Sequence, residues 1–488
     1  MIEIKTKIHD QFSIEFKEGF VVRQDVRKNN FAVNTWIFLP NSLDINPQTY
    51  GKDQFYRDVK SNVRMITPVF LLRDIAGNQA LPLHYLHQAM QAMASSPTDA
   101  NIAEFEYQIK MFCAIVKSSL RDEANHITAT RPTSDVLFLA ESYLQVMADI
   151  LVAFRGLRQI INVPTVSDNL RSYFSFGDEF LGHIASLYTF RVLAKIDATT
   201  PDAPLRKDIA SFISANEEYK VSMGYPIVRQ GDVKGNKDLV YQHGILKKYI
   251  ESDLYLNLNK KKDGVAVEQL LYSIAAGLAM IFATVVSFSV QRSYGSLSIP
   301  LFVALIISYM LKDRIKELMR YWFAHRLGKK YFDNKSIVKI KDATIGWMKD
   351  GVDFISDKKT PKEVLELRNR SALLQAENRI FDEKIILYRK LVYIDSQKLA
   401  ANNNYLTSGI HDILRLHVNR FTQKMDNPQQ DLQMITPDGT VQEVISQKIY
   451  YINIIIQVRY DDNIEYKRFR ITVSRDGIQG VEALFPQK

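Results

Sequence analysis

Residues 270–290 read LLYSIAAGLAMIFATVVSFSV, and residues 299–311 read IPLFVALIISYML. No charged residue lies between Glu268 and Arg292. As a helix, the first stretch would rise about 31 Å at ~1.5 Å per residue, which matches the roughly 30 Å hydrocarbon core of a bilayer. A short polar segment separates it from the shorter second stretch. We therefore predict a two-helix transmembrane hairpin over residues 268–312, the only membrane-spanning element of an α+β protein.

The positive charge of the chain gathers around this hairpin. The net charge is +9, and residues 247–330 alone hold 13 Lys and Arg against 6 Asp and Glu. Twelve of these positive charges flank the apolar stretches, and only Arg292 lies between them. Because cytoplasmic flanks carry the excess of Lys and Arg, both termini are expected in the cytoplasm, as in a two-pass protein of a bacterial inner membrane. A bilayer with anionic headgroups is the expected partner, and nucleic acid is not expected.

The second apolar stretch is expected to continue as a helix beyond the bilayer. Residues 313–330 have the pattern of a basic amphipathic juxtamembrane helix. Lys312, Lys316 and Arg320 form a stripe along it, which is expected to bind lipid headgroups.

Small residues recur at a spacing of four in both apolar stretches, and such stripes let helices pack closely in lipid. They are Ala275, Ala279, Ala283 and Ser287 in the first stretch, and Ser296, Pro300, Ala304 and Ser308 in the second. We expect the two stripes to pack against each other. In the alternative, one stripe also contacts a second protomer, and the protein is a homo-oligomer.

Most of the chain must fold in water, since the mean hydropathy is −0.15. Residues 1–75 are predicted to be β-rich, and residues 76–256 to form a cytoplasmic helical bundle. Val136–Phe154 is as long as a membrane span, but Glu141 and Asp149 would each cost roughly 3 kcal/mol on insertion, so a core helix is expected. The predicted helices cover 82–95, 100–127, 135–160, 167–196, 204–221 and 237–256.

Residues 331–488 are predicted to form a cytoplasmic α+β domain that ends in a β meander. Thr360-Pro361-Lys362-Glu363 has the pattern of a capping box, which predicts a helix as far as Ala376. Alternating apolar residues and Asp-containing turns predict three antiparallel strands near the C-terminus. The strands cover 450–460, 464–474 and 478–484, with two more of the same sheet at 387–394 and 413–421 and loops at 402–404 and 428–430.

Few residues have the spacing that metal chemistry requires. His84 and His87 are three apart and could bind a metal ion on a helix, but no further ligand accompanies them. Glu123-x-x-His126 has the spacing of half a di-iron site. The other half is missing because Glu179 and His183 are four residues apart. We therefore expect no metal and no cofactor.

Three other motifs favour structural interpretations. Residues 231–238 form a glycine-bearing loop without the Gly-Lys-Ser/Thr end of a phosphate-binding loop, which favours a surface turn. The basic stretch Tyr466–Arg470 could contact RNA, but Lys and Arg also protect the edge of a sheet, and we favour that interpretation. Cys113 lies in an apolar run and is expected to be a buried structural thiol.

With no complete catalytic motif, the expected function is that of a membrane-anchored scaffold or sensor that faces the cytoplasm and has no catalytic activity of its own. A protein partner is possible for such a scaffold. One alternative is an enzyme whose active site is assembled across the cytoplasmic domains. Another is a membrane effector whose hairpins oligomerise into a pore.

Overall fold

The computed structural model divides the chain into two compact units. The helical unit comprises residues 64–256 and 403–408, and the β unit comprises residues 1–63, 257–402 and 409–488. The predicted α+β class is confirmed at the level of strands, then a helical region with two long apolar helices, then antiparallel strands. The structure describes residues 2–75, 81–131, 133–201, 203–295, 299–327 and 332–484, with the backbone alone for residues 133, 300 and 324–327.

The helical unit contains the helices that the apolar periodicity predicts, with two differences: the predicted helix 135–160 is divided into two, and the helix predicted for 237–256 begins at residue 233 and ends at residue 250. Its elements are α2 (Leu72–Ile75), α3 (Leu81–Ser95), α4 (Asp99–Ala129), α5 (Thr133–Gly156), α6 (Arg158–Ile161), α7 (Asp168–Thr199), α8 (Leu205–Ser222), α9 (Val233–Ile250) and a 3-10 turn (Ser252–Leu254). Three stacked rings hold α4, α5 and α7 together: Phe154 lies 5.5 Å from Phe112 and 4.7 Å from Phe174, centroid to centroid. Cys113 is fully buried beside this stack, as predicted.

The β unit contains two large sheets and a two-stranded ribbon. An eight-stranded sheet has the order β14-β13-β12-β3-β8-β7-β6-β5, and a four-stranded sheet has the order β1-β2-β9-β4. The strands are β1 (Ile2–Asp10), β2 (Ser13–Val21), β3 (Lys28–Leu39), β4 (Val59–Met65), β5 (Asn257–Lys262), β6 (Asn334–Ile340), β7 (Ala343–Ile355), β8 (Lys384–Asp395), β9 (Gly409–His417), β10 (Gln429–Ile435), β11 (Val441–Gln447), β12 (Tyr450–Tyr460), β13 (Asn463–Ser474) and β14 (Gly477–Leu484). Its short helices are α1 (Lys52–Asp58), α12 (Lys362–Arg368), α13 (Ala372–Asn378), α14 (Ser396–Ala401) and α15 (Asn419–Thr422), with 3-10 turns at Asn41–Leu43 and Asp357–Lys359.

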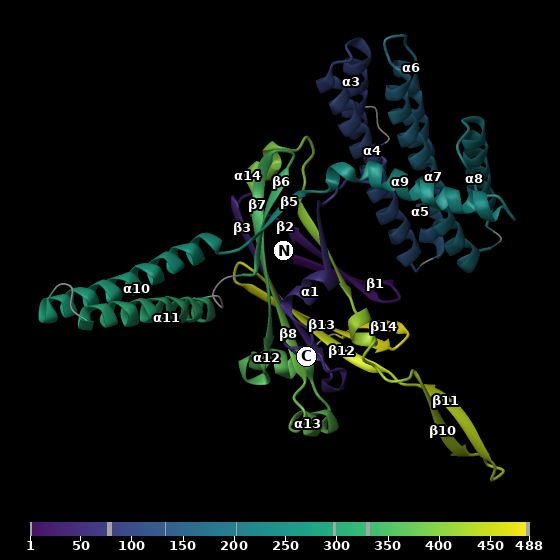
Figure 1. Ribbon diagram of the computed structural model, residues 1–488. Coiled ribbons are helices and arrows are strands. Elements are labelled where there is room, and N and C mark those ends of the chain that lie inside the picture. Colours follow the sequence, from purple (N-terminus) through teal and green to yellow (C-terminus); the bar gives the residue numbers. More distant parts are fainter. Residues whose placement is uncertain are drawn as a thin grey trace. The chain divides into compact units, whose positions relative to one another are not determined.

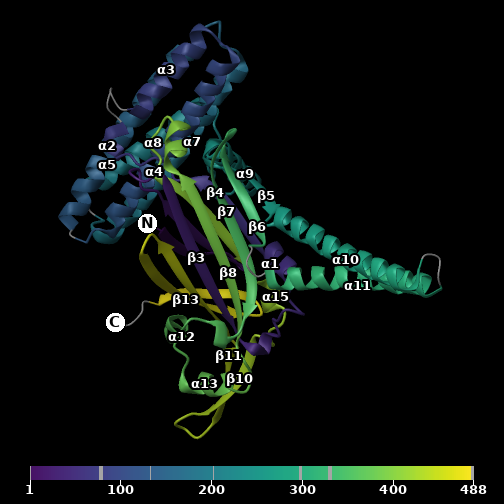
Figure 2. The ribbon, with the colours of Figure 1, turned by 90° about the vertical axis from the view of Figure 1, so that its left-hand side faces the viewer.

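Strands from both ends of the chain share these sheets. β3 lies between β12 and β8, with Thr35 opposite Ile456 on one side and Tyr388 on the other. Figure 2 shows β3, β8 and β7 side by side. In the four-stranded sheet, β2 pairs with β9, and Phe16 lies opposite Leu414. The β-rich N-terminal segment and the C-terminal strands therefore build one folded unit.

The apolar hairpin is inserted between two neighbouring strands. β5 and β6 are antiparallel partners, and their last pair joins Lys262 to Asn334. Between these residues the chain forms α10 (Val265–Tyr294) and α11 (Ile299–Leu327), which lie side by side (Figure 1). The two helices thus leave from the paired ends of adjacent strands.

Several features of the β unit differ from the sequence-based expectations. The helix predicted from the capping box is two short helices, because Asn369 adopts a left-handed φ of 46° after α12; Pro361 is the N-cap, and no side chain caps it. Residues 413–421 do not join the meander sheet: β9 lies in the four-stranded sheet. Residues 429–430 start β10, which pairs with β11 (Figure 1). The stretch 334–355, for which no strand was predicted, forms β6 and β7.

Candidate membrane-anchoring site

Small side chains lie where α10 and α11 meet. Ala275 and Ala279 are fully buried, and Ser308 of α11 is 2% exposed. The Ser308 hydroxyl donates a hydrogen bond of 3.2 Å to the carbonyl oxygen of Ala283, which also accepts one of 2.8 Å from Ser287. These contacts bring the two small-residue stripes together within one chain. Ser296 and the side chain of Pro300 lie outside the described residues.

The outer surface of the hairpin is apolar over most of α10 and over the part of α11 before Lys312. Phe288 of α10 and Phe302 of α11 are 67% and 66% exposed. The other large exposed aliphatic residues described on the pair are Val265, Val267, Leu270, Ile274, Leu278, Met280, Ile281, Val285, Ile299, Val303, Leu305, Ile306, Ile307, Met310, Leu311 and Leu318. An exposed apolar surface of this size marks a protein or membrane contact in folded proteins.

Two helices in the described part of the chain are long and apolar enough to cross a membrane, namely 134–161 and Val265–Tyr294. In the most apolar 18 residues of 134–161, one third of the residues are buried, whereas in the corresponding stretch of Val265–Tyr294 only 17% are. In α5 the apolar stripe that includes Val136, Tyr143 and Phe154 is buried, while Glu141 and Asp149 are exposed on the other side. A lipid-facing surface would not carry these two carboxylates, so α5 has the pattern of a core helix.

Helix α11 has a shorter uncharged stretch, because charged residues follow its apolar half. The Ser308–Ala283 bond sets the level of one helix against the other, so Lys312, one turn further along, lies level with about Ala279. Closer to β5 and β6, which we call the root of the hairpin, the Arg320 guanidinium lies 5.2 Å from the ring centroid of Tyr272. The apolar half of α10 nearest the strands is therefore level with the basic stripe of α11.

The stripe residues have local partners. The Lys312 ammonium lies 3.9 Å above the ring of Tyr309. Lys316 is 4.0 Å from Asp313, and Arg320 is 3.3 Å from Glu317. Arg326 is described by its backbone alone, and Lys329 and Lys330 lie outside the described residues. The stripe residues with described side chains therefore make contacts within α11.

At the root, a cavity of about 470 Å³ lies where α10 joins the eight-stranded sheet. Apolar side chains (Leu271, Phe323 and Phe332) and ion-paired polar ones line it together. Asp263 is 2.9 Å from Lys349 of β7, and Lys52 is 2.8 Å from Asp333. Burial opposes it, but the hydrogen bonds and charges of Asp333 and Asp353 raise the pKa of Lys52. These contacts attach the hairpin to the sheet.

The side chains proposed for metal chemistry do not converge. His84 and His126 are exposed, on different helices. Within the described ranges, no three His, Cys, Asp or Glu side chains are grouped so that they could hold a metal ion. Glu179 accepts a hydrogen bond of 2.7 Å from Gln242, and burial raises its pKa. The ring of His183 stacks on that of His243, with 3.6 Å between the ring centroids. Burial, together with the charges of His243 and Lys220, lowers the pKa of His183 to about 4.

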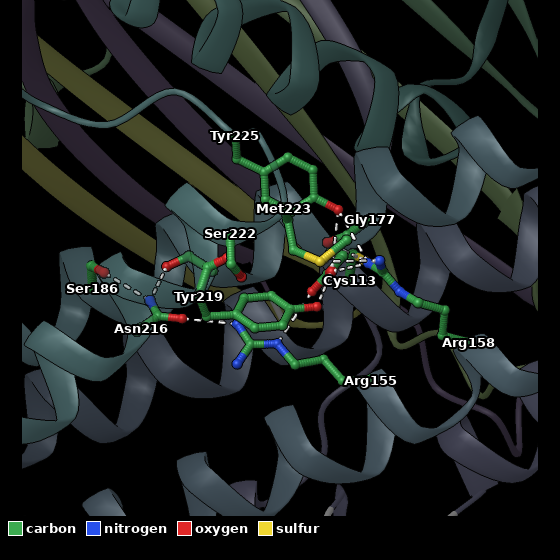
Figure 3. A network of polar contacts seen from close by, with 12 residues as sticks. Cys113, Arg155, Arg158, Gly177, Ser186, Asn216, Tyr219, Ser222, Met223 and Tyr225 are labelled. Carbon is green, nitrogen blue, oxygen red and sulfur yellow. Dashed lines mark hydrogen bonds and ion pairs between the residues drawn. The ribbon is translucent and has the colours of Figure 1, made fainter.

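A polar cluster of the helical unit centres on Asp178, which sequence reasoning missed. Its fully buried carboxylate accepts hydrogen bonds from Arg158 at 2.5 Å and from Tyr219 at 2.7 Å. Arg155 lies 3.3 Å from the same carboxylate and 2.8 Å from Asn216. Figure 3 shows these side chains converging from α5, α6 and α8. Every oxygen of Asp178 is engaged, so the cluster joins helices and leaves no free base.

The interpretation of Tyr466–Arg470 as a protected edge is wrong for Arg468–Arg470. β13 pairs with β12 on one side and, from Arg468 to Ser474, with β14 on the other, so this part of it is an inner strand. Arg468 and Arg470 line a second cavity instead. The only signal in the sequence was the position of two arginines two residues apart on an alternating strand, which places both on one face.

The comparisons with known proteins give no assignment. No protein-family model matches the chain, and searches of curated proteins and of solved structures return no match. Function must therefore be argued from the geometry.

Overpacking the stripe tests the contact between α10 and α11. Ala279→Leu adds three carbon atoms at a fully buried position, which is expected to destabilise the helix pair by about 1–3 kcal/mol. Leu278→Ile, an exposed neighbour, should change it by much less. Both variants are compared by thermal unfolding in mild detergent, with size measured by light scattering. Equal stability of the two would show that the stripe does not hold the helices together.

Proposed function

We propose that this chain is a membrane-anchored scaffold or sensor that faces the cytoplasm, with α10 and α11 as its anchor. The observation that carries the proposal is the apolar outer surface of both helices around an interface of small residues. Fully burying one large apolar side chain contributes about 1.5–3 kcal/mol. More than a dozen such side chains are exposed on this pair, and lipid would bury them all at once.

The unequal helices determine how deep the anchor can lie. From Ile299 to Leu311 the apolar part of α11 rises only about 20 Å, less than a hydrocarbon core of roughly 30 Å. The flexible stem of Lys312 can extend one turn towards the headgroups, and the bilayer can thin locally. These adjustments favour a hairpin that crosses the bilayer with its basic stripe at the cytoplasmic surface.

One observation favours the pore-forming alternative. Lys312, Arg314 and Lys316 lie level with an apolar part of α10, so several hairpins arranged in a ring could turn these charges towards water. A ring of this kind requires an oligomer in the membrane, which cross-linking in vesicles would detect.

The topology can be tested with single cysteines in a Cys113→Ala background. Ser293→Cys near the tip is expected to react with a membrane-impermeant thiol reagent on intact cells, because basic residues on both flanks of the hairpin favour a tip outside the cell. Lys261→Cys in β5 should react only after the cells are permeabilised. Ser293→Cys protected from both sides would instead indicate a hairpin that ends inside the bilayer, and release of the protein by alkaline carbonate would rule out the anchor.

A scaffold or sensor must also connect its anchor to its soluble surface. Here the connection is short: α10 begins three residues after β5, and the ion pair of Asp263 with Lys349 links the junction to β7. A displacement of the hairpin would therefore act directly on the edge of the eight-stranded sheet.

A further inference from the structure

A cavity of about 450 Å³ lies in the β unit, where α12 and α13 (Figure 2) adjoin β12 and β13. Four arginines line it: Arg368 and Arg370 from the helical segment, and Arg468 and Arg470 from β13. Tyr450, Tyr451, Phe381 and Leu374 provide apolar walls. The volume falls in the range of small-molecule sites in proteins.

Three of the four arginines are neutralised by carboxylates. Arg368 lies 2.9 Å from Glu383, and Arg370 bridges Glu383 and Asp357 at 2.9 and 2.8 Å. Arg470 pairs with Glu482 across the strands, at 2.7 Å. These pairs hold the rim of the cavity in place without an added ligand.

Arg468 differs from the other three. Within the described ranges its guanidinium has no hydrogen bond or ion pair, and its Nε is buried. Burial, and then the charges of Arg368 and Arg470, lower its pKa. A partly buried cation without a counter-ion is costly, because the protein does not replace the water it loses. An anion in the cavity would offset that cost.

Asn453 gives a second, independent observation. Its side chain is only 2% exposed, lines the same cavity and lies opposite Arg470 in the β12–β13 register. Its Oδ1 has no hydrogen-bond partner among the described residues. A buried amide left unsatisfied costs about 1–3 kcal/mol, so a ligand group that bonds to it is strongly favoured. The amide can donate to a phosphoryl oxygen and accept from a hydroxyl.

We propose that this cavity binds a small organic phosphate that also carries hydroxyl groups, with Arg468 as the main ligand of the phosphoryl group and Asn453 as a second polar contact. The planar guanidinium matches the spacing of phosphoryl oxygens. The aromatic walls suit the organic part of the ligand. A phospholipid headgroup has the same phosphoryl and hydroxyl chemistry, so the test separates a soluble ligand from a lipid.

The test measures binding to the purified full chain in detergent. Inorganic phosphate, AMP and phosphatidylglycerol in mixed detergent micelles are the three probes, with neutral phosphatidylcholine in the same micelles as reference. Thermal unfolding is followed by tryptophan fluorescence, which reports on the β unit because Trp36, Trp322 and Trp347 all lie in it. AMP is expected to raise the midpoint and inorganic phosphate to raise it less. A response to phosphatidylglycerol alone would assign the site to a lipid headgroup.

Two cavity variants and one control make the test specific. Arg468→Met should weaken AMP binding by about 10- to 100-fold, the usual loss for a hydrogen bond to a charged group. Asn453→Asp keeps the side-chain shape but places a carboxylate among the arginines, so it should abolish binding and raise the midpoint without ligand. Arg459→Met, an exposed arginine of β12 outside the cavity, should bind AMP like the unchanged chain.

The proposal is overturned if no probe raises the midpoint, or if Arg468→Met binds AMP as tightly as Arg459→Met does. The inference deepens the proposed sensor function by naming the class of its ligand. Only the role of the ligand as a signal rests on the proposed function; binding itself does not. Binding is measured without a bilayer, so its failure is distinct from a failure of the membrane anchor.

Discussion

The substitution Lys390→Met is expected to lower the free energy of unfolding of the β unit by about 3–5 kcal/mol. Lys390 of β8 is 2% exposed, and its ammonium lies 2.5 Å from Glu18 of β2 and 2.6 Å from Asp412 of β9. Methionine keeps the length of the side chain but removes the only cation that the described residues place between these two carboxylates. The loss is large because both carboxylates would stay buried with like charge.

This ion trio links the two large sheets of the β unit. β8 belongs to the eight-stranded sheet, while β2 and β9 belong to the four-stranded one. Ser61 donates a further hydrogen bond of 2.6 Å to Asp412. Burial and the neighbouring charge of Asp412 raise the pKa of Glu18, although Lys390 opposes this shift. Because the three charged groups are stable only when they are buried together, the trio fixes how the two sheets pack.

A matched lysine separates this effect from the loss of any ion pair. Lys7→Met removes the Lys7–Glu15 pair of 3.1 Å, but Lys7 is largely exposed, so a loss of at most about 1 kcal/mol is expected. Urea unfolding followed by tryptophan fluorescence measures both variants. Adding Glu18→Gln and Asp412→Asn to Lys390→Met should restore part of the stability. Equal losses for Lys7→Met and Lys390→Met would contradict the assigned role.

The sequence predicts local structure well and sheet partners poorly, for a physical reason. The apolar periodicity of α4 or α7 lies within one continuous segment of the sequence, and so does the alternation along β12. By contrast, the pairing of β3 with both β12 and β8 depends on contacts hundreds of residues apart. Alternation shows that a strand has a buried face, but it does not say which strand lies beside it. For this reason β9 was assigned to the wrong sheet.

The candidate sites differ in the same way. The apolar hairpin and its small residues are continuous in sequence, so Ala279 and Ser308 could be predicted to face a helix. The arginine cavity combines Arg368 with Arg468. The position of Arg468 in this cavity can be recognised only once the neighbours of β13 in the sheet are known. Likewise, Asp178 is surrounded by residues of three other elements, and nothing adjacent to it in the chain indicates them.

Asp178→Asn is expected to destabilise the helical unit by about 3 kcal/mol. The substitution is isosteric, but it leaves Arg155 and Arg158 without the carboxylate that neutralises both. Removing one partner of a buried pair typically costs about 3–5 kcal/mol, and the lower end applies here because both guanidinium groups are about one-fifth exposed. The amide also accepts less strongly from Tyr219, whose hydroxyl lies 2.7 Å away.

The single cysteine provides a direct measurement of this effect. Cys113 is fully buried, and its sulfur lies 3.8 Å from the carbonyl oxygen of Gly177, the neighbour of Asp178. A thiol reagent reaches it only when the helical unit opens, so a loss of about 3 kcal/mol should speed labelling by about 100-fold. Asp197→Asn, on the same helix as Asp178, removes an exposed pair with Arg206 of α8 and should change the rate by less than about tenfold. If both variants are labelled at the same rate, the Asp178 cluster does not hold the helices together.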